Sequence, residues 1–253
     1  MFCGLGGFMP IVSTDIKRYK SKSTASADGE SGGDGLGGYR SSDEIITDTD
    51  ENLFDNVSAA ESEVGDTEYR AFFIKNTHAT LSFVAAKVYI SPTGTLPMSL
   101  LTTQLENGGS ETTVDVADAS DFPTSGAFFV EDEEVTYTGK SGNQFTGCTR
   151  GANGTSKVLH TTAKRVEHNQ VRFYVEEPSN KSTGYIATIA DESTSPAGSP
   201  TWLNPYTFAT GASIGTLAPG EFYGVWVRRK IPVGCKAKTG ISYVFARKGE
   251  TAE

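Results

Sequence analysis

The chain has 253 residues, 37% of them hydrophobic, which is enough for one large domain or two modest ones with an adequate core. Its formal net charge is −9 at pH 7, whereas binding to a phosphate backbone depends on clustered Lys and Arg, so nucleic acid is not an expected partner. The 28 glycines, with many Ser and Thr residues, favour strands and turns over helices.

Three further classes of protein are not expected, because the sequence lacks their features. No stretch approaches the ~20 consecutive apolar residues that a membrane-spanning helix needs. The apolar start, residues 1–10, is short and carries no basic residue, so a signal peptide is not expected. Cys3, Cys148 and Cys235 are too scattered for a disulfide framework or a zinc site. We expect their thiols to be reduced and mostly buried, as in a protein that is synthesised inside a cell.

Residues 1–50 are predicted to be an extended N-terminal arm outside the core. Residues 11–19 alternate weakly and can form one strand, but residues 21–38 are rich in Ser, Gly and Asp. Such a segment alone cannot bury enough surface to offset its loss of conformational entropy. We therefore expect neighbouring chains to order it, and we expect a chain without residues 1–40 to keep its sandwich while losing assembly.

The next block, residues 51–100, is predicted to contain one short helix and two strands. Ser58 is a suitable N-cap for a helix that ends before Gly65. From residue 69 the hydrophobic period changes to two, giving strands at 69–75 and 81–90 with a polar turn at 76–78. We expect these strands to pair as a hairpin. The residues expected on one face of the second strand are Val84, Ala86, Val88 and Ile90.

Residues 101–165 are predicted to be a small inserted β domain, either a barrel or a sandwich. Short strands recur at roughly ten-residue spacing, with glycine-rich turns between them. The expected strands are 112–116, 127–130, 134–138 and 144–148.

The sequence after the insertion predicts the second half of the host domain, with strands at 171–175, 185–190, 206–208, 221–230 and 241–246. In the strand at 221–230, Phe222 and Trp226 share one face, while Tyr223, Val225 and Val227 share the other. A strand with large apolar groups on both faces is central in its sheet or covered by a partner. The prediction is an all-β protein: an Ig-like or jelly-roll-like sandwich formed by residues 51–100 and 166–253, interrupted by the insertion and preceded by the arm.

A catalytic or metal site is not indicated. His78, His160 and His168 have no metal-ligand spacing, and His78 is expected in a surface turn. The acidic run 131–134 offers paired carboxylates, but acids between two strands commonly cap a solvated turn, which is our interpretation here. Residues 48–52 begin like a calcium loop but lack its central Gly. The glycine runs at 4–7 and 32–38 lack the context of a phosphate loop. We expect no enzyme activity, no cofactor and no metal.

Four sequence strings resemble a group of tailed-phage and prophage virion structural proteins. They are Ser-Thr-Asp-Ile-Lys (13–17), Leu-Phe-Asp-Asn-Val-Ser (53–58), Gly-Asp-Thr-Glu-Tyr-Arg (65–70) and Val-Trp-Val-Arg-Arg (225–229). The resemblance covers most of residues 11–92 and 171–247. It implies a part of a phage particle with no enzymatic role.

The insertion resembles a second phage-associated module that is common in tail and other virion proteins. The matching elements are Phe-Pro-x-x-Gly (122–126), Glu134-x-x-Tyr137, Thr-Arg-Gly-Ala (149–152), Gly154-Thr155 and His160. Shorter relatives of the host family lack this interruption. We expect the insertion to decorate the outside of the particle.

Together these resemblances imply a virion protein, made in the host cytoplasm, that assembles with copies of itself and with other virion proteins. A tail, baseplate or tail-adaptor protein is the favoured role, and a capsid decoration or head-associated protein is the alternative. A glycan-binding or hydrolytic module is a third possibility that needs exposed aromatic residues or an acid pair. Neither nucleic acid nor membrane is an expected partner. The residues predicted at subunit interfaces are Ile11, Ile16, Lys17, Arg18, Tyr19, Arg228 and Arg229.

Overall fold

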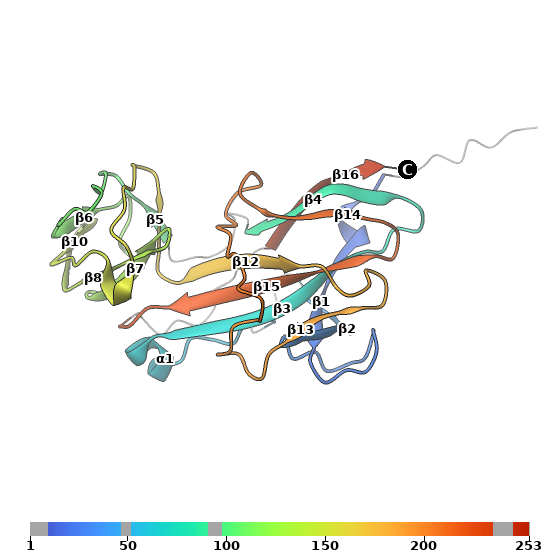
Figure 1. The fold of residues 1–253 in the computed structure, drawn as a ribbon. Coiled ribbons are helices and arrows are strands. Elements are labelled where there is room, and N and C mark those ends of the chain that lie inside the picture. The colour runs from blue at the N-terminus through green and yellow to red at the C-terminus, as the bar shows by residue number, and fades with distance from the viewer. Residues whose placement is uncertain (1–9, 47–51, 91–97, 235–244, 253) are drawn as a thin grey trace, which may run out of the picture.

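The computed structural model describes residues 10–46, 52–90, 98–234 and 245–252. Within these ranges the fold is nearly all β and sandwich-like, as the sequence predicts, with antiparallel strands throughout. Figure 1 shows a large set of strands and, beside it, a small group of short strands drawn in green and yellow. No helix in these ranges is long and apolar enough to cross a bilayer.

The large part contains two sheets. The first has six strands, in the order β12 (Gln170–Glu176), β15 (Phe222–Ile231), β3 (Asp66–Asn76), β1 (Ile16–Lys22), β2 (Gly37–Glu44) and β13 (Tyr185–Thr188). The second has β14 (Ala212–Leu217), β4 (Ser82–Ile90) and β16 (Phe245–Ala252). The main core fills the space between them, with Phe72 and Val225 from the first sheet and Phe83 and Val88 from the second.

Strand β15 is central and buried on both faces, which confirms the prediction made from its sequence. It pairs with β12 on one side and with β3 on the other. Val225 and Val227 belong to the core between the sheets, whereas Phe222 and Trp226 belong to a second cluster on the opposite face.

The six-stranded sheet curls so that its two ends meet over this second cluster. Glu176 on β12 accepts hydrogen bonds from the Trp226 indole N–H and from the backbone N–H of Ala187, each at 2.8 Å. Ile186 of β13 lies against Gly224 of β15. A Cβ added to Gly224 would lie 2.6 Å from the Ile186 side chain, which is too close. Gly224 is therefore the residue that lets the rim of the curl close on the central strand.

Residues 16–44 are not an extended arm, so that expectation is wrong for the described part of the segment. They form β1 and β2, and β1 lies between β3 and β2 inside the sheet. The polar loop between them is held within this chain, because its backbone N–H groups donate to carboxylates: Ser23 to Asp34, Ser26 to Glu30, and Gly33 to Asp43 of β2. Composition alone does not predict this ordered loop, because hydrogen bonds with polar side chains hold it and buried apolar side chains do not.

The predicted hairpin of residues 69–90 is also wrong, because β3 and β4 lie in different sheets. At the corner between them the buried Asn76 amide donates to the carbonyl oxygens of Leu81 and Leu217, at 2.8 and 3.0 Å. Both strands therefore face the same core from opposite sides. His78 lies in the turn as expected, and its Nδ1 accepts N–H bonds from Thr80 and Leu81.

The predicted face of β4 is correct for Ala86, Val88 and Ile90 but not for Val84. Ala85 has a positive φ of 49°, and the register with β14 and β16 shifts in this part of the strand. This irregularity turns Phe83 into the core and leaves Val84 half-buried. The helix α1 (Ala59–Val64) is capped by Ser58 and ends at Gly65, as predicted.

The C-terminal strands are only partly as expected. Strand β14 was not predicted, residues 206–208 form no strand, and residues 241–244 of the predicted last strand lie outside the described residues. Beyond the sheets, the described residues contain two short 3₁₀ turns, at Ser13–Asp15 and Ala152–Gly154.

The small group of strands is built by the chain between β4 and β12. One sheet has β6 (Thr113–Asp115), β10 (Gln144–Thr146) and β9 (Gly139–Ser141); the other has β5 (Met98–Leu100), β11 (Arg165–Glu167), β7 (Gly126–Val130) and β8 (Glu133–Tyr137). We call residues 98–167 the module. It has its own apolar core around Phe128 and Phe145, and the first and last strands of the module pair with each other.

Removing residues 1–44 is therefore expected to abolish cooperative folding of the large part, because β3 loses its neighbour β1 and the curl loses β2. Thermal unfolding followed by circular dichroism checks this. Lys17→Met, which removes a surface ion pair of β1 and leaves the strand in place, is the control and is expected to melt like the full chain. A sharp, unshifted transition in the truncated chain would contradict the role assigned to β1.

Candidate functional site

Three of the four sequence strings meet in one ionic cluster at an end of the β3–β15 ladder. Asp55 comes from the string at 53–58, Glu68 from 65–70 and Arg229 from 225–229. Glu68 and Arg229 are directly opposite each other across the two strands. The strings therefore mark residues that are distant in sequence and in contact in the fold.

Arg229 is the centre of this cluster and is almost fully buried. Its Nε donates to Oε2 of Glu68, and its other nitrogens donate to the carbonyl oxygen of Asp55 at 2.8 Å and to the Asp55 carboxylate at 3.4 Å. The guanidinium also lies 4.7 Å from the centre of the Phe54 ring. These contacts hold the 53–58 segment against β3 and β15.

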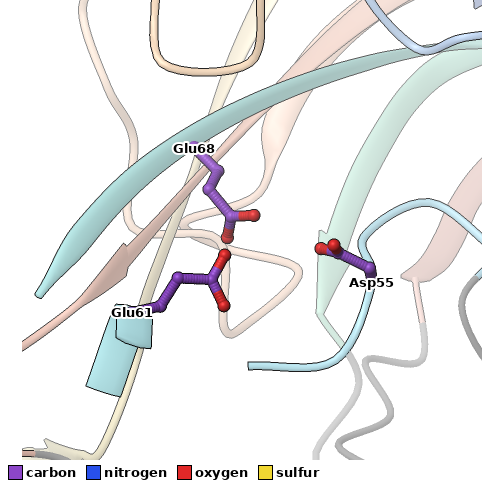
Figure 2. A group of neighbouring side chains, drawn as sticks. All are labelled: Asp55, Glu61 and Glu68. Carbon is purple, nitrogen blue, oxygen red and sulfur yellow. The ribbon is translucent and has the colours of Figure 1, made fainter. Parts of the chain in front are cut away.

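Figure 2 shows that a third carboxylate, Glu61 of α1, lies beside Glu68 and Asp55. One oxygen from each residue lies within 4.8 Å of the others. Burial raises the pKa of Glu68, and the hydrogen bond and charge of Arg229 oppose that rise. None of these residues has a distinctive spacing in the sequence, so the sequence does not predict the cluster.

The predicted interface residues of the N-terminal segment lie on or next to β1. Ile16 is buried in the main core, and Ile11 packs against that core from its edge. Lys17 donates to Glu44 at 2.9 Å, Arg18 is half-buried, and the Tyr19 ring lies 4.7 Å from the Arg40 guanidinium. A subunit interface at these positions stays a prediction. The Ile16 side chain is already buried within this chain, so it is not available for such an interface.

Arg228 and Arg229 likewise have partners within the chain. Arg228 donates to Gln170 at 2.9 Å and lies 5.1 Å from the centre of the Trp202 ring. Trp202 also contacts Tyr69 and Tyr174, and Trp226 is fully buried. Arg229 is enclosed by the cluster described above, so its side chain would not face a partner.

A second ionic network lies inside the module and is centred on Arg150 and His160. Arg150 is buried and donates to both oxygens of Glu133, at 2.8 and 2.7 Å, and to Glu111 at 2.9 Å. His160 contacts Glu133 at 2.9 Å and Glu131 at 3.1 Å. Burial opposes the charge on Glu133, but the hydrogen bonds from Arg150, Val158 and His160 hold its pKa below the usual value.

The acidic run 131–134 is therefore not a solvated turn throughout, and that interpretation is corrected. Glu133 and Glu134 are buried, and Glu134 accepts a hydrogen bond from Asn153 at 2.7 Å. Tyr137 donates to the carbonyl oxygen of Pro123 at 3.0 Å. The motif residues of the insertion thus hold the module together, as cross-links between loops that its small apolar core cannot fix alone.

Replacing Arg150 by Met is expected to destabilise the module by about 3–5 kcal/mol, because Glu133 would be left buried without its partner. Hydrogen exchange measured peptide by peptide checks this, with faster exchange expected across residues 98–167. Lys157→Met, which removes an exposed cation from the same loop, is the control. Equal exchange in the two variants would contradict the structural role of Arg150.

A third ion pair lies where the module joins the sandwich. Arg172 of β12 contacts Glu167 of β11 at 3.1 Å, and both side chains are buried. The same guanidinium donates to the carbonyl oxygen of Glu131 and to Asp132 at 3.2 Å, both in the β7–β8 turn of the module. Gln170 donates to the same carbonyl at 2.7 Å. Polar contacts therefore fix this turn of the module to strand β12.

Glu167 should make stability depend on pH. Burial raises its pKa to about 7, against the opposing charge of Arg172. Between the ordinary value of 4.5 and about 7, the unfolded chain releases this proton while the folded chain retains it, so stability falls as pH rises through that window.

Urea unfolding at a series of pH values checks this expectation. The difference in midpoint between the wild type and Glu167→Gln should change across the window and level off above it. A constant difference would mean that Arg172 keeps Glu167 ionised throughout.

Cys148 is the cysteine within the described residues; it is free and buried, and burial raises its pKa to about 11. Cys3 and Cys235, the glycine run at 4–7 and Asp48 to Glu51 of the incomplete calcium loop lie outside those residues. Comparisons with protein-family models, with curated proteins and with solved structures find no match to this chain.

Proposed function

We propose that this protein is a structural component of a tailed-phage particle, with a tail, baseplate or tail-adaptor position as the favoured role. The observation that carries the proposal is the set of four sequence strings that resemble those of virion structural proteins. Three of them supply Asp55, Glu68 and Arg229, and Arg229 contacts both carboxylates. Strings that meet in space are better support for a common fold than strings scattered over a surface.

The N-terminal end of the β1–β2 pair is the surface that best suits assembly. Val12 and Ile46 expose 51% and 64% of their surface. Ile45 donates its backbone N–H to the carbonyl oxygen of Arg18, so Ile46 lies at the same end of the strand pair as Val12. Two exposed apolar side chains at one end of a strand pair would gain from burial in a subunit contact.

Copy number tests the favoured role. Virions purified from a strain that encodes this chain, measured by quantitative mass spectrometry, should contain about six or twelve copies per particle if the protein surrounds the tail axis. On the order of hundreds of copies would place it on the capsid instead. Absence from purified particles, with a glycan array positive for host-surface sugars, would overturn the proposal and favour a glycan-binding protein.

A paired substitution tests the assembly surface. Val12→Asp with Ile46→Asp is expected to leave the monomer folded, because both side chains are exposed, and to reduce incorporation into particles. Val64→Asp, an equally exposed apolar position on α1, is the control. Incorporation that falls equally in the control, or not at all in the double variant, would exclude this surface.

A further inference from the structure

We propose that Asp55, Glu61 and Glu68 form a binding site for a divalent cation, with Ca²⁺ as the ion that fits their chemistry. The three residues come from separate elements: the segment before α1, α1 itself and β3. Figure 2 shows their carboxylates converging. The inference does not depend on the proposed role in a phage particle.

The spacing of the oxygens fits one shared ion. One oxygen from each carboxylate lies within 4.8 Å of the others. Calcium binds oxygen at about 2.3–2.6 Å, so two oxygens on the same ion lie at most about 5 Å apart. The three carboxylates can therefore reach a common Ca²⁺ without rearrangement of the backbone.

The orphaned oxygen of Glu68 is an independent observation that indicates a missing partner. Glu68 is completely buried, and its Oε1 has no hydrogen-bond partner within the described residues. Its other oxygen is bound by Arg229. A buried carboxylate oxygen without a partner is costly, and a cation placed between the three carboxylates would remove that cost.

The charge balance also leaves room for a divalent ion. Arg229 contacts Glu68 and Asp55, and the Ser58 backbone N–H donates to Glu61 at 2.6 Å. Each carboxylate is thus held through one oxygen. Three ionised carboxylates against one guanidinium leave two negative charges, which a divalent cation neutralises.

The ligand set selects among metals. All three groups are carboxylates, and hard oxygen ligands favour Ca²⁺ or Mg²⁺ over zinc or copper. Asp55 is exposed, so water can complete the coordination shell on that side. Ca²⁺ accepts such irregular, partly hydrated sites, whereas Mg²⁺ requires nearly ideal octahedral geometry.

Calcium titration of the full chain tests the site, after removal of metals with EDTA and dialysis. Isothermal titration calorimetry should show one ion per chain with a dissociation constant of about 1 mM or tighter. The thermal midpoint should rise with CaCl₂ and not with NaCl of equal ionic strength. No heat and no shift up to about 10 mM CaCl₂ would overturn the proposal.

Matched variants then assign the ion to these residues. Asp55→Asn with Glu61→Gln changes the two ligands that are not buried while preserving side-chain size and an acceptor oxygen, and it should weaken calcium binding by at least about tenfold. The circular dichroism spectrum of the double variant checks that it is folded. Glu63→Gln, an exposed residue of the same helix, should bind like the wild type. Unchanged affinity in the double variant would overturn the assignment.

Glu68→Gln distinguishes a metal ligand from a protonated buried acid. A metal ligand predicts loss of the calcium-dependent rise in midpoint. If Glu68 is protonated and no ion binds, this variant would match the wild type in the absence of calcium and neither protein would respond to it, which would overturn the proposal.

Discussion

The pairing of β3 with β15 is the contact on which the rest of the fold depends. It runs from Phe222 opposite Lys75 to Ile231 opposite Asp66, in the middle of the six-stranded sheet. One face of this pair supplies the core against the second sheet, and the other supplies the cluster enclosed by the curl. A strand pair covered on both sides leaves no exposed face for polar side chains, so charged residues within it require partners.

The same requirement holds for buried charges elsewhere in the chain, and each described buried ion pair lies at a strand end or a junction. Arg229 meets Glu68 across the central pair, Arg172 meets Glu167 where β11 leads into β12, and Arg150 meets Glu133 in the module. Each pair connects segments that apolar packing alone would hold loosely. Such pairs contribute modest net stability, but separating the partners leaves a buried charge without compensation. Each pair therefore disfavours other arrangements of the segments that it connects.

Patterns within one strand were predictable from the sequence, whereas choices of partner were not. The two apolar faces of β15 and the Ser58 cap follow from local periodicity and capping chemistry. The crossing from β3 to β4 between sheets depends on Asn76 bonding to Leu217, far along the chain. The loop before β2 is ordered by Asp34 and Asp43, polar contacts that hydrophobic periodicity cannot detect. The Asp55, Glu68 and Arg229 cluster required the ladder register, which no single segment contains.

The module enters and leaves through strands that are hydrogen-bonded neighbours, with Leu100 opposite Arg165 and Met98 opposite Glu167. The two ends of the module therefore lie about one strand spacing apart, roughly 4.8 Å. Ends that lie this close together are the condition under which a folded unit can be inserted into a connection of another fold without pulling that connection open.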